Sequence, residues 1–340
     1  MNPAESLPVT GEPLWEDPLN LEAMSGRAAD PVESPARAAG AAAPGTHLAR
    51  FWELRGRPVF EMHGVWWGHH RGPFYTSLPF QLKVDLDPGE VGEILRRARI
   101  PGLSFPTHRP GLPAGHYVIS PAGYGLSAVS RKQRGHVTHG LEVCELRTLA
   151  EDELLEKGPP LNRDTLDRQS REDATFLDPV AWKRFVRAVG ACPGMTIHGA
   201  FVDGRLATYL ISCRDGEWLH LIYKMSSTAD REHYPNHALD FAIIRDAAAD
   251  PGIRFIGNGM TSVLPNEGLD RYKRQLGYQL EPHQLSIHFH PWLAPALGGA
   301  TAAVTWLNAR FPGREGLAYR AKILEGAWLS RRPWSGPQAS

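Results

Sequence analysis

The sequence predicts an α/β protein (α+β, with a mixed sheet), and three observations in its second half support this fold class. Three strand-like runs follow one another with Asp-Gly turns between them, at 196–202, 205–213 and 217–225. Asp203-Gly204 and Asp215-Gly216 favour tight antiparallel turns. Helix and strand patterns then alternate: a helix near Asn236, a strand at 253–257, a helix at 268–276 and a strand from Tyr278. The run at 253–257 is typical of a strand buried inside a sheet.

The helix before the three strands has clear ends. Asp178 is the expected N-cap, Pro179 occupies the first helical position and Gly190 ends the helix. Its apolar stripe consists of Trp182, Phe185, Val186 and Val189. We therefore expect a helix over 179–190 that packs one face on the sheet.

The first half has weaker signals of the same kind. Aromatic and β-branched residues at 58–86 predict two or three strands, and apolar residues at helical spacing predict a helix at 88–99. Four further short elements are expected: a strand at 117–119, a basic helix at 126–139, a strand at 141–146 and an acidic helix at 151–157.

Composition limits the function classes. The chain has 340 residues, 42% hydrophobic, and equal numbers of basic and acidic side chains, 37 each. Zero net charge argues against broad, nonspecific binding to nucleic acid or anionic membrane, although a local basic groove is still compatible with it. The three cysteines show no paired spacing, no apolar run is long enough for a membrane span, and no signal sequence is evident, so we expect a cytoplasmic protein.

Two segments resemble a known family. Residues 130–134 and 140–143 combine a basic helix with a Gly-Leu-Glu-Val run, and 268–277 reads Gly-Leu-Asp-Arg-Tyr-Lys-Arg-Gln-Leu-Gly after the strand at 253–259. The second segment is similar to a Gly-x-x-x-(Phe/Tyr)-Lys-x-x-x-Gly signature. Together these segments resemble the FemAB-like branch of the GNAT acyltransferase superfamily, over roughly residues 58–290. Each motif is short, so their order and spacing carry the resemblance.

The resemblance implies an architecture. It predicts tandem GNAT-like halves, with the N-terminal half at 49–165 degenerate and the C-terminal half at 166–292. A Pro-, Ala- and Gly-rich tail at 1–48 is expected to be disordered, with order from near Phe51, and 293–340 to form a helical extension with a polar tail.

The resemblance also implies an activity. A protein of this family transfers an acyl or aminoacyl group from acyl-CoA, another thioester or aminoacyl-tRNA onto a small-molecule or peptide amine. No tightly bound cofactor is expected, and tRNA is a possible partner. The sequence has no nucleophile motif, which favours direct attack without a covalent enzyme intermediate.

One departure from the family concerns the donor. The CoA pyrophosphate loop, (Arg/Gln)-x-x-Gly-x-(Gly/Ala), should lie between Met225 and Asn236, where this chain has Arg231 but no glycine. Phosphate binding at a helix N-terminus needs accessible backbone N–H groups, and Pro235 removes one of them. The choice between acyl-CoA and aminoacyl-tRNA stays open.

The strand at 217–225 carries the first candidate residues. Strict alternation would place Trp218, His220, Ile222 and Lys224 on one face. We expect His220 to act as general base, since histidine titrates near neutral pH, and Tyr272 to protonate the leaving group, as the resemblance implies. The alternatives are a structural histidine and a core tyrosine.

Binding roles follow from the resemblance and from position. Five residues are expected on the donor: Lys224, Met225, Arg231, Asn236 and Lys273. Four residues after the strand at 253–257 are expected on the acceptor: Asn258, Thr261, Asn266 and Glu267. The alternatives are solvated charges for Lys273 and Arg271 and helix-capping roles for Asn266 and Glu267.

Other polar groups give weaker signals. Glu172 and Asp173 are second-choice bases, and the basic cluster of Arg131, Lys132 and Arg134 could attract a phosphate-bearing donor or simply be solvated. The paired histidines at 69–70 and at 288 and 290 lack a third ligand at suitable spacing, so no metal is expected. A different class remains open, a non-catalytic GNAT-like binding or scaffold protein. Its mark would be complete pairing of the strand that ends at Met225 with the strand that begins near Ile253.

Overall fold

A computed structural model of the chain describes residues 45–264, 266–293, 297, 301, 303–304, 306–308, 310–311 and 315–334. The described residues form two compact units. Unit 1 contains Tyr117–Gly259 and Asn266–Leu280, and unit 2 contains the described parts of Leu14–His116, Met260–Pro265 and Glu281–Ser340. The boundaries of the two units are set by which residues pack together. The tandem halves expected at 49–165 and 166–292 stay a prediction.

Unit 1 is built on a mixed sheet with the strand order β10-β9-β8-β7-β6. The strands are β6 (Glu145–Thr148), β7 (Met195–Val202), β8 (Arg205–Asp215), β9 (Trp218–Ser226) and β10 (Phe255–Met260). Their pairings are antiparallel except that of β10 with β9, which is parallel. The hairpin predicted at Asp203-Gly204 is confirmed, with both turn residues at positive φ, 49° and 75°.

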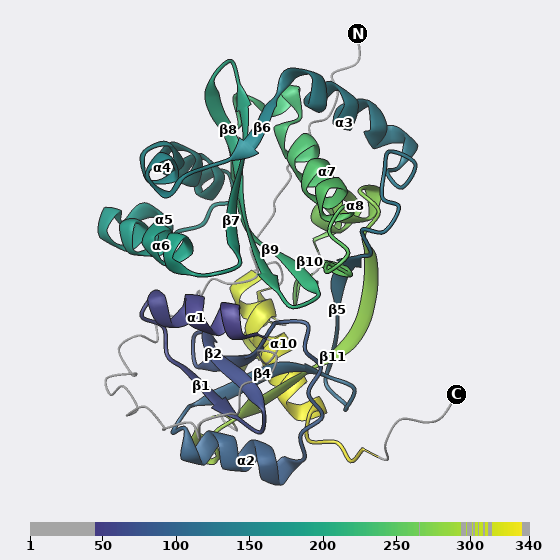
Figure 1. The fold of residues 1–340 in the computed structure, drawn as a ribbon. Coiled ribbons are helices and arrows are strands. Elements are labelled where there is room, and N and C mark those ends of the chain that lie inside the picture. Colours follow the sequence, from purple (N-terminus) through teal and green to yellow (C-terminus); the bar gives the residue numbers. More distant parts are fainter. Residues whose placement is uncertain are drawn as a thin grey trace. The chain divides into compact units, whose positions relative to one another are not determined.

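Helices cover both faces of this sheet. They are α3 (Arg131–Val143), α4 (Glu151–Arg168), α5 (Ala174–Leu177), α6 (Pro179–Ala191), α7 (Pro235–Ala247) and α8 (Glu267–Gln275), with a 3₁₀ turn η2 (Arg231–His233). Figure 1 shows α4, α5 and α6 on one face and α3, α7 and α8 on the other. Asp178 caps α6 as predicted, its Oδ1 accepting a hydrogen bond from the Ala181 N–H at 2.8 Å.

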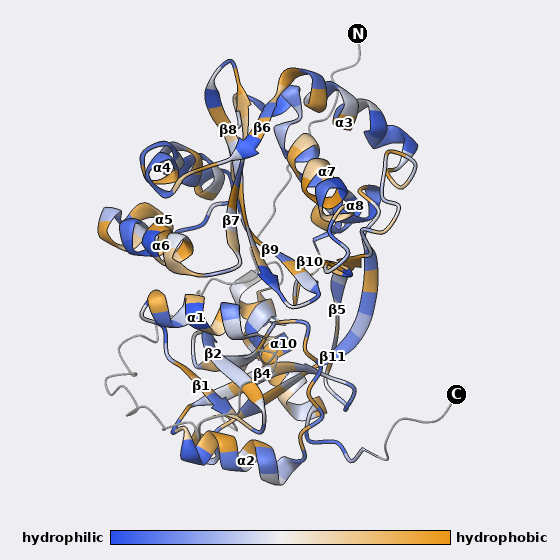
Figure 2. Ribbon diagram, in the orientation of Figure 1, coloured by the Kyte–Doolittle hydropathy of each residue, from blue (hydrophilic) through white to orange (hydrophobic). Residues whose placement is uncertain are grey.

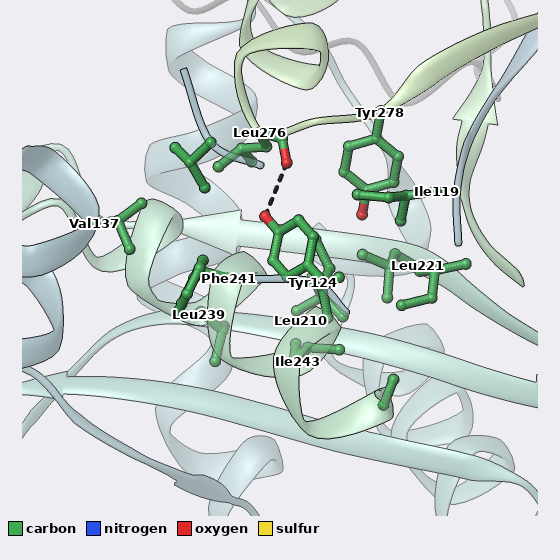
Figure 3. Close-up of a cluster of buried hydrophobic side chains, with 14 of the residues drawn as sticks. Ile119, Tyr124, Val137, Leu210, Leu221, Leu239, Phe241, Ile243, Leu276 and Tyr278 are labelled. Atoms are coloured by element: carbon green, nitrogen blue, oxygen red, sulfur yellow. Dashed lines mark hydrogen bonds between the residues drawn. The ribbon is translucent and has the colours of Figure 1, made fainter. Parts of the chain in front are cut away.

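The side of the sheet under α7 holds an apolar core of unit 1. It combines residues of β8, β9, α3, α7 and the end of α8, among them Leu210, Leu221, Val137, Phe241 and Leu276. Figure 3 shows this cluster, in which the Tyr124 hydroxyl donates to the Leu276 carbonyl at 2.8 Å. The core therefore fixes the C-terminal end of α8 against the sheet.

Two expectations in unit 1 were wrong in extent. The strand expected at 141–146 is helical to Val143, and β6 begins only at Glu145. Helix α3 packs closely on the start of α7 here, where a Cβ at Gly140 would lie 2.8 Å from the Tyr234 carbonyl oxygen. The basic helix begins at Arg131 rather than 126.

Helix α4 continues well beyond the short helix expected at 151–157. It runs to Arg168 through Pro159 and Pro160, whose missing N–H groups would normally end a helix. Trp182 of α6 donates from Nε1 to the Leu155 carbonyl at 3.3 Å, the group that Pro159 leaves without its helical donor. Tertiary packing thus compensates for the proline. In Figure 2 most of the α4 ribbon has the colours of hydrophilic residues.

Unit 2 contains strands in the order β1-β2-β3-β4-β11. They are β1 (Val59–Met62), β2 (Val65–Arg71), β3 (Phe74–Leu78), β4 (Gly102–Thr107) and β11 (Gln279–Phe289), which begins in unit 1; β5 (Leu112–Ile119) ends there. Helices α1 (Thr46–Leu54), α2 (Pro88–Arg97) and α10 (Glu315–Leu329) and the turn η3 (Pro291–Leu293) complete it.

The first and last helices of unit 2, α1 and α10, can be compared with the disordered tail and the helical extension expected from the sequence. Helix α1 begins at Thr46, before the start expected near Phe51, because Leu48 is already fully buried. The rest of the expected disordered tail, 1–44, lies outside the described residues. The predicted helical extension is confirmed for α10, where Ile323 and Ala327 pack against Leu285 and Ile287 of β11; parts of 294–314 and all of 335–340 lie outside the described residues.

Candidate functional site

Strands β9 and β10 pair only at their beginnings. The parallel register joins Trp218 to Phe255, Leu219 to Ile256 and His220 to Gly257. No pairing between these strands follows in the described residues, although β9 continues to Ser226 and β10 to Met260. Gly259 has φ +68°, a left-handed conformation that glycine adopts without strain and that bends β10. A wedge between the two strands therefore opens just after His220.

A β-bulge re-aims the side chains of β9 beyond that point. Ile211 and Ser212 of β8 pair with Tyr223 and Leu221, so Ile222 is an extra residue. Strict alternation was therefore wrong here. Leu221 lies in the core beside α7 and Lys224 also reaches α7, whereas the Tyr223 ring packs on Phe185 of α6 at 5.1 Å. Lys224 does not share a face with His220.

The bulge places Lys224 in a small charged cluster with Asp240 of α7 and Tyr272 of α8. Lys224 Nζ donates to Asp240 Oδ2 at 2.6 Å, and the Tyr272 hydroxyl donates to the same oxygen at 2.7 Å. Lys224 Nζ also lies 5.0 Å from the centre of the Tyr272 ring. Asp240 is fully buried, and its Oδ1 has no hydrogen-bond partner among the described residues. A buried carboxylate with a vacant acceptor is unusual and calls for an explanation.

This cluster fixes the protonation of Tyr272. Burial raises the pKa of its phenol well above the usual value of 10.0, and the negative charge of Asp240 and the hydrogen bond to it raise that pKa further. Tyr272 therefore keeps its proton at neutral pH and holds it on Asp240. Tyr272 also packs edge-on against His237 of α7, with ring centres 5.0 Å apart.

Lys273, the next residue of α8, points to the other diverging strand. Its Nζ donates to the Asn258 carbonyl of β10 at 2.6 Å and lies 4.6 Å from the centre of the Tyr117 ring. The residue is 4% exposed, so the alternative of a solvated helix charge is wrong for Lys273. Burial lowers the pKa of its amine to about 7. Arg271, by contrast, is exposed.

His220 lies at the last paired position, where the wedge begins. Its ring stacks on Trp218 with 5.9 Å between centres, and Nε2 has no hydrogen-bond partner among the described residues. Burial lowers the pKa of the imidazole to about 4, so it is neutral at pH 7 but a weak proton acceptor. Its expected role as general base stays a prediction.

The segment between β9 and α7 has little backbone to offer a phosphate. Seven of its N–H groups donate to protein acceptors, those of Ser226, Ser227, Thr228, Asp230, Arg231, His233 and Tyr234. The Thr228 N–H donates to the Asp164 carboxylate of α4 at 2.6 Å, and Arg168 pairs with that carboxylate at 3.0 Å and donates to the Thr228 hydroxyl. Arg231 is half-buried in η2 and Met225 is buried, while the Asn236 Oδ1 lies 2.9 Å from the Thr208 hydroxyl.

The predicted acceptor residues do not form one group. Asn266 caps α8, its Oδ1 accepting from the Leu269 N–H at 3.1 Å, and Glu267 is the first residue of that helix. The capping alternative is thereby confirmed for Asn266. Thr261 belongs to unit 2, where its N–H donates to the Gly115 carbonyl at 2.8 Å. Asn258 alone stands on a diverging strand, with its carbonyl on Lys273.

The weaker candidates have structural roles. Asp173 caps α5 by accepting from the Thr175 N–H, and Arg134 donates to the carbonyls of Val129 and Ser127. His288 pairs with the Ser286 hydroxyl at 2.7 Å. Across the described ranges, no group of three or more His, Cys, Asp or Glu side chains is placed to hold a metal ion.

The surface of α8 carries a hollow that lies apart from the charged cluster around Asp240. A hollow of about 430 Å³ on α8 is lined by Ser130, Glu267, Asp270, Arg271, Arg274 and Gln275, a set that does not include Asp240, Lys224 or Tyr272. In the part of the chain that the structure describes, no helix has the length and apolar character to cross a membrane.

Sequence reasoning missed Asp240. The residue lies in the run Ala238–Ile244, which is apolar except for this carboxylate. A single acid inside an apolar helix face, one turn after Asn236, was a usable signal, because buried charges need a partner.

Comparisons with known proteins address the fold. No family profile matches the sequence, and no curated protein matches it. The structure of FemX is similar, with 12% identity over 70% of this chain and 90% of that chain and a TM-score of 0.51. The C-terminal domain of a putative lysylphosphatidylglycerol synthetase from Agrobacterium fabrum is also similar, with 12% identity, coverages of 71% and 87% and a TM-score of 0.50.

A tandem GNAT protein from the clavulanic acid biosynthesis pathway matches at 16% identity, over 67% of this chain and 79% of that chain, with a TM-score of 0.43. The chain therefore shares the fold of FemX and of that synthetase domain.

Proposed function

We propose that this chain is an N-acyltransferase that moves an acyl or aminoacyl group from an activated donor onto an amine by direct attack. The observation that carries the proposal is the divergence of β9 and β10 after His220 and Gly257. The scaffold alternative requires a continuous ladder between these strands, and their register argues against it. Side chains of α8 reach both strands beyond the divergence, Tyr272 beside Lys224 and Lys273 on Asn258.

The proposed step forms a C–N bond and breaks the C–O or C–S bond of the donor ester or thioester. The donor carbonyl lies along the edge of β9 that β10 has left, where backbone N–H groups stabilise the oxyanion. The amine attacks and loses a proton. Tyr272 gives its proton to the departing oxygen or sulfur, and the high pKa of the phenol keeps that proton available at neutral pH.

Two groups are proposed to take the proton of the amine. His220 stands where the wedge begins, but its pKa of about 4 makes it a weak acceptor. Asp240 has a vacant Oδ1 in the same cluster as Tyr272. Separate His220→Ala and Asp240→Asn variants decide between them, because only loss of the true base should lower kcat by about 10²- to 10⁴-fold, the usual contribution of a positioned base.

For the donor, we propose an aminoacyl ester in preference to acyl-CoA. The β9–α7 segment supports this choice, because seven of its N–H groups are engaged by protein acceptors. A CoA pyrophosphate needs N–H donors at that helix start. Lys224, Met225, Arg231 and Asn236 remain proposed donor contacts, and Asn258, Thr261, Asn266 and Glu267 proposed acceptor contacts.

The experiment measures thermal stabilisation and turnover together. The purified full chain is titrated with CoA, acetyl-CoA and a mixture of charged tRNAs, and acyl transfer to a panel of amines is followed by mass spectrometry. We expect charged tRNA to raise the melting temperature and to give an amide product, since a ligand that binds the native state stabilises it. Binding without any product, in the wild type and in Tyr272→Phe alike, would instead support the scaffold alternative.

A further inference from the structure

The end of β10 must be held in place where this strand diverges from β9. Beyond its last pair with β9, the end of β10 needs other contacts to fix its place. Gly257 is the last residue of β10 that pairs with β9, and Asn258 is the next residue along. The Phe255 N–H donates to the Glu217 carbonyl, so the backbone groups of Phe255 and Gly257 face β9 and those of Asn258 face the opposite side. The Asn258 carbonyl accepts a hydrogen bond from Lys273 Nζ at 2.6 Å. A side chain of α8 thus anchors β10 on the side away from β9, at the first position after the ladder ends.

The residue that makes this bond is almost completely buried. Lys273 is 4% exposed, and its Nζ lies 4.6 Å from the centre of the Tyr117 ring, within range of a cation–π contact. A Cβ placed on Gly259 would lie 3.7 Å from the same Nζ, so the amine sits directly against the bend of β10. Helix α8 is itself fixed, by the Asn266 cap at its start and by the Tyr124 hydroxyl on Leu276 just after its end.

From these contacts we infer that Lys273 is a positioning residue that holds β10 away from β9 and so keeps the wedge open for the donor. The inference rests on the proposed function for its purpose, but the mechanical role belongs to the fold alone. It replaces the expected role of Lys273 as a ligand for a donor phosphate, because a buried amine engaged by a backbone carbonyl is not available to one.

Hydrogen–deuterium exchange tests the role without requiring turnover. In Lys273→Met the side chain keeps its length and apolar stem but loses the donor to Asn258. We expect the peptide that covers residues 254–260 to exchange about tenfold faster or more, because the end of β10 loses its anchor. Peptides from β7 and β8 should be unchanged and serve as the internal reference.

Arg271→Met is the matched control. It removes one positive charge from the same helix with the same replacement, but Arg271 is exposed. We expect exchange at 254–260 to stay within twofold of the wild type in this variant. Equal acceleration in both variants, or no acceleration in Lys273→Met, overturns the inference.

Donor kinetics separate positioning from direct contact. If Lys273 positions β10, Lys273→Met raises the KM for the donor while the dependence of KM on salt stays that of the wild type. A phosphate ligand would instead flatten that salt dependence and leave exchange at 254–260 unchanged, which contradicts the inference. Faster exchange in a protein that shows no transferase activity would refute the proposed function and leave the role of Lys273 standing.

Discussion

At the scale of single residues, the site is organised around Asp240. One carboxylate oxygen accepts from both Lys224 and Tyr272, so the strand and the helix on either side of α7 are joined through a single atom. A charge buried this deeply costs free energy unless it is paired, and polar groups of this kind are more often retained for function than for stability.

Replacing the Tyr272 hydroxyl should impair catalysis with little effect on folding. Tyr272→Phe keeps the ring on His237 and removes only the proton donor. We expect kcat to fall by about 10²- to 10⁴-fold, the usual contribution of a positioned general acid. Steady-state kinetics measure the fall. Retention of full turnover by a normally folded Tyr272→Phe protein would show that another group protonates the leaving atom.

Removing Asp240 should leave the Lys224 ammonium without its ion-pair partner. We expect Asp240→Ala to lower the free energy of unfolding by about 1–3 kcal/mol, because the Lys224 side chain that it leaves unpaired is 27% exposed and partly hydrated. Lys224→Met alone leaves Asp240 buried without its cation and should also destabilise. Urea denaturation of Asp240→Ala combined with Lys224→Met is the decisive measurement, because the double variant should lose less than the two single variants added together.

At the scale of elements, patterns identified most helices and strands of unit 1, since turn and cap residues mark their ends locally. Asp178 and Pro179 mark the start of α6, and Asp203 and Gly204 mark the turn between β7 and β8. The features that the sequence did not predict depend on residues that are distant along the chain. The bulge at Ile222 depends on the register of β8, and the passage of α4 through Pro159 depends on Trp182.

The link between Pro159 and Trp182 can be measured by a double-mutant cycle. Trp182→Phe keeps an aromatic ring in the α6 core but leaves the Leu155 carbonyl without its donor. We expect a loss of about 1–3 kcal/mol in unfolding free energy, the range for an unsatisfied buried group. In a Pro159→Ala background the restored N–H can bond Leu155, so the same substitution should cost less. Equal costs in both backgrounds would mean that ring packing alone explains the effect.

The candidate site likewise combines features that the sequence predicted with features that it did not predict. Sequence placed His220, Tyr272 and Lys273 close to the diverging strands, because the order of elements fixes where each one lies. It could not find Asp240 as their partner or show that Lys273 is buried. Both depend on how α7 and α8 pack on the sheet, and no local pattern encodes that packing.

At the scale of the whole molecule, several buried histidines tie stability to pH. Burial lowers the pKa of His220 in unit 1 and of His283 in unit 2 to about 4, from 6.5. Both are almost fully buried, at 6% and 5% exposed, and neither ring nitrogen of His283 has a partner among the described residues. Each is therefore neutral in the folded protein at pH 5, where the unfolded chain would be protonated.

The sign of the resulting pH dependence follows from the proton count. Between about pH 6.5 and pH 4 the unfolded chain binds more protons than the folded one, so the free energy of unfolding falls as pH is lowered through that window. Each such histidine contributes up to about 1.4 kcal/mol per pH unit. Urea denaturation of the wild type and of His283→Phe at intervals from pH 7.5 to 4.5 measures it. The variant should lose stability less steeply, because the phenyl ring packs on His116 at the same place without binding a proton. Parallel curves for the two proteins would assign the acid sensitivity to other groups.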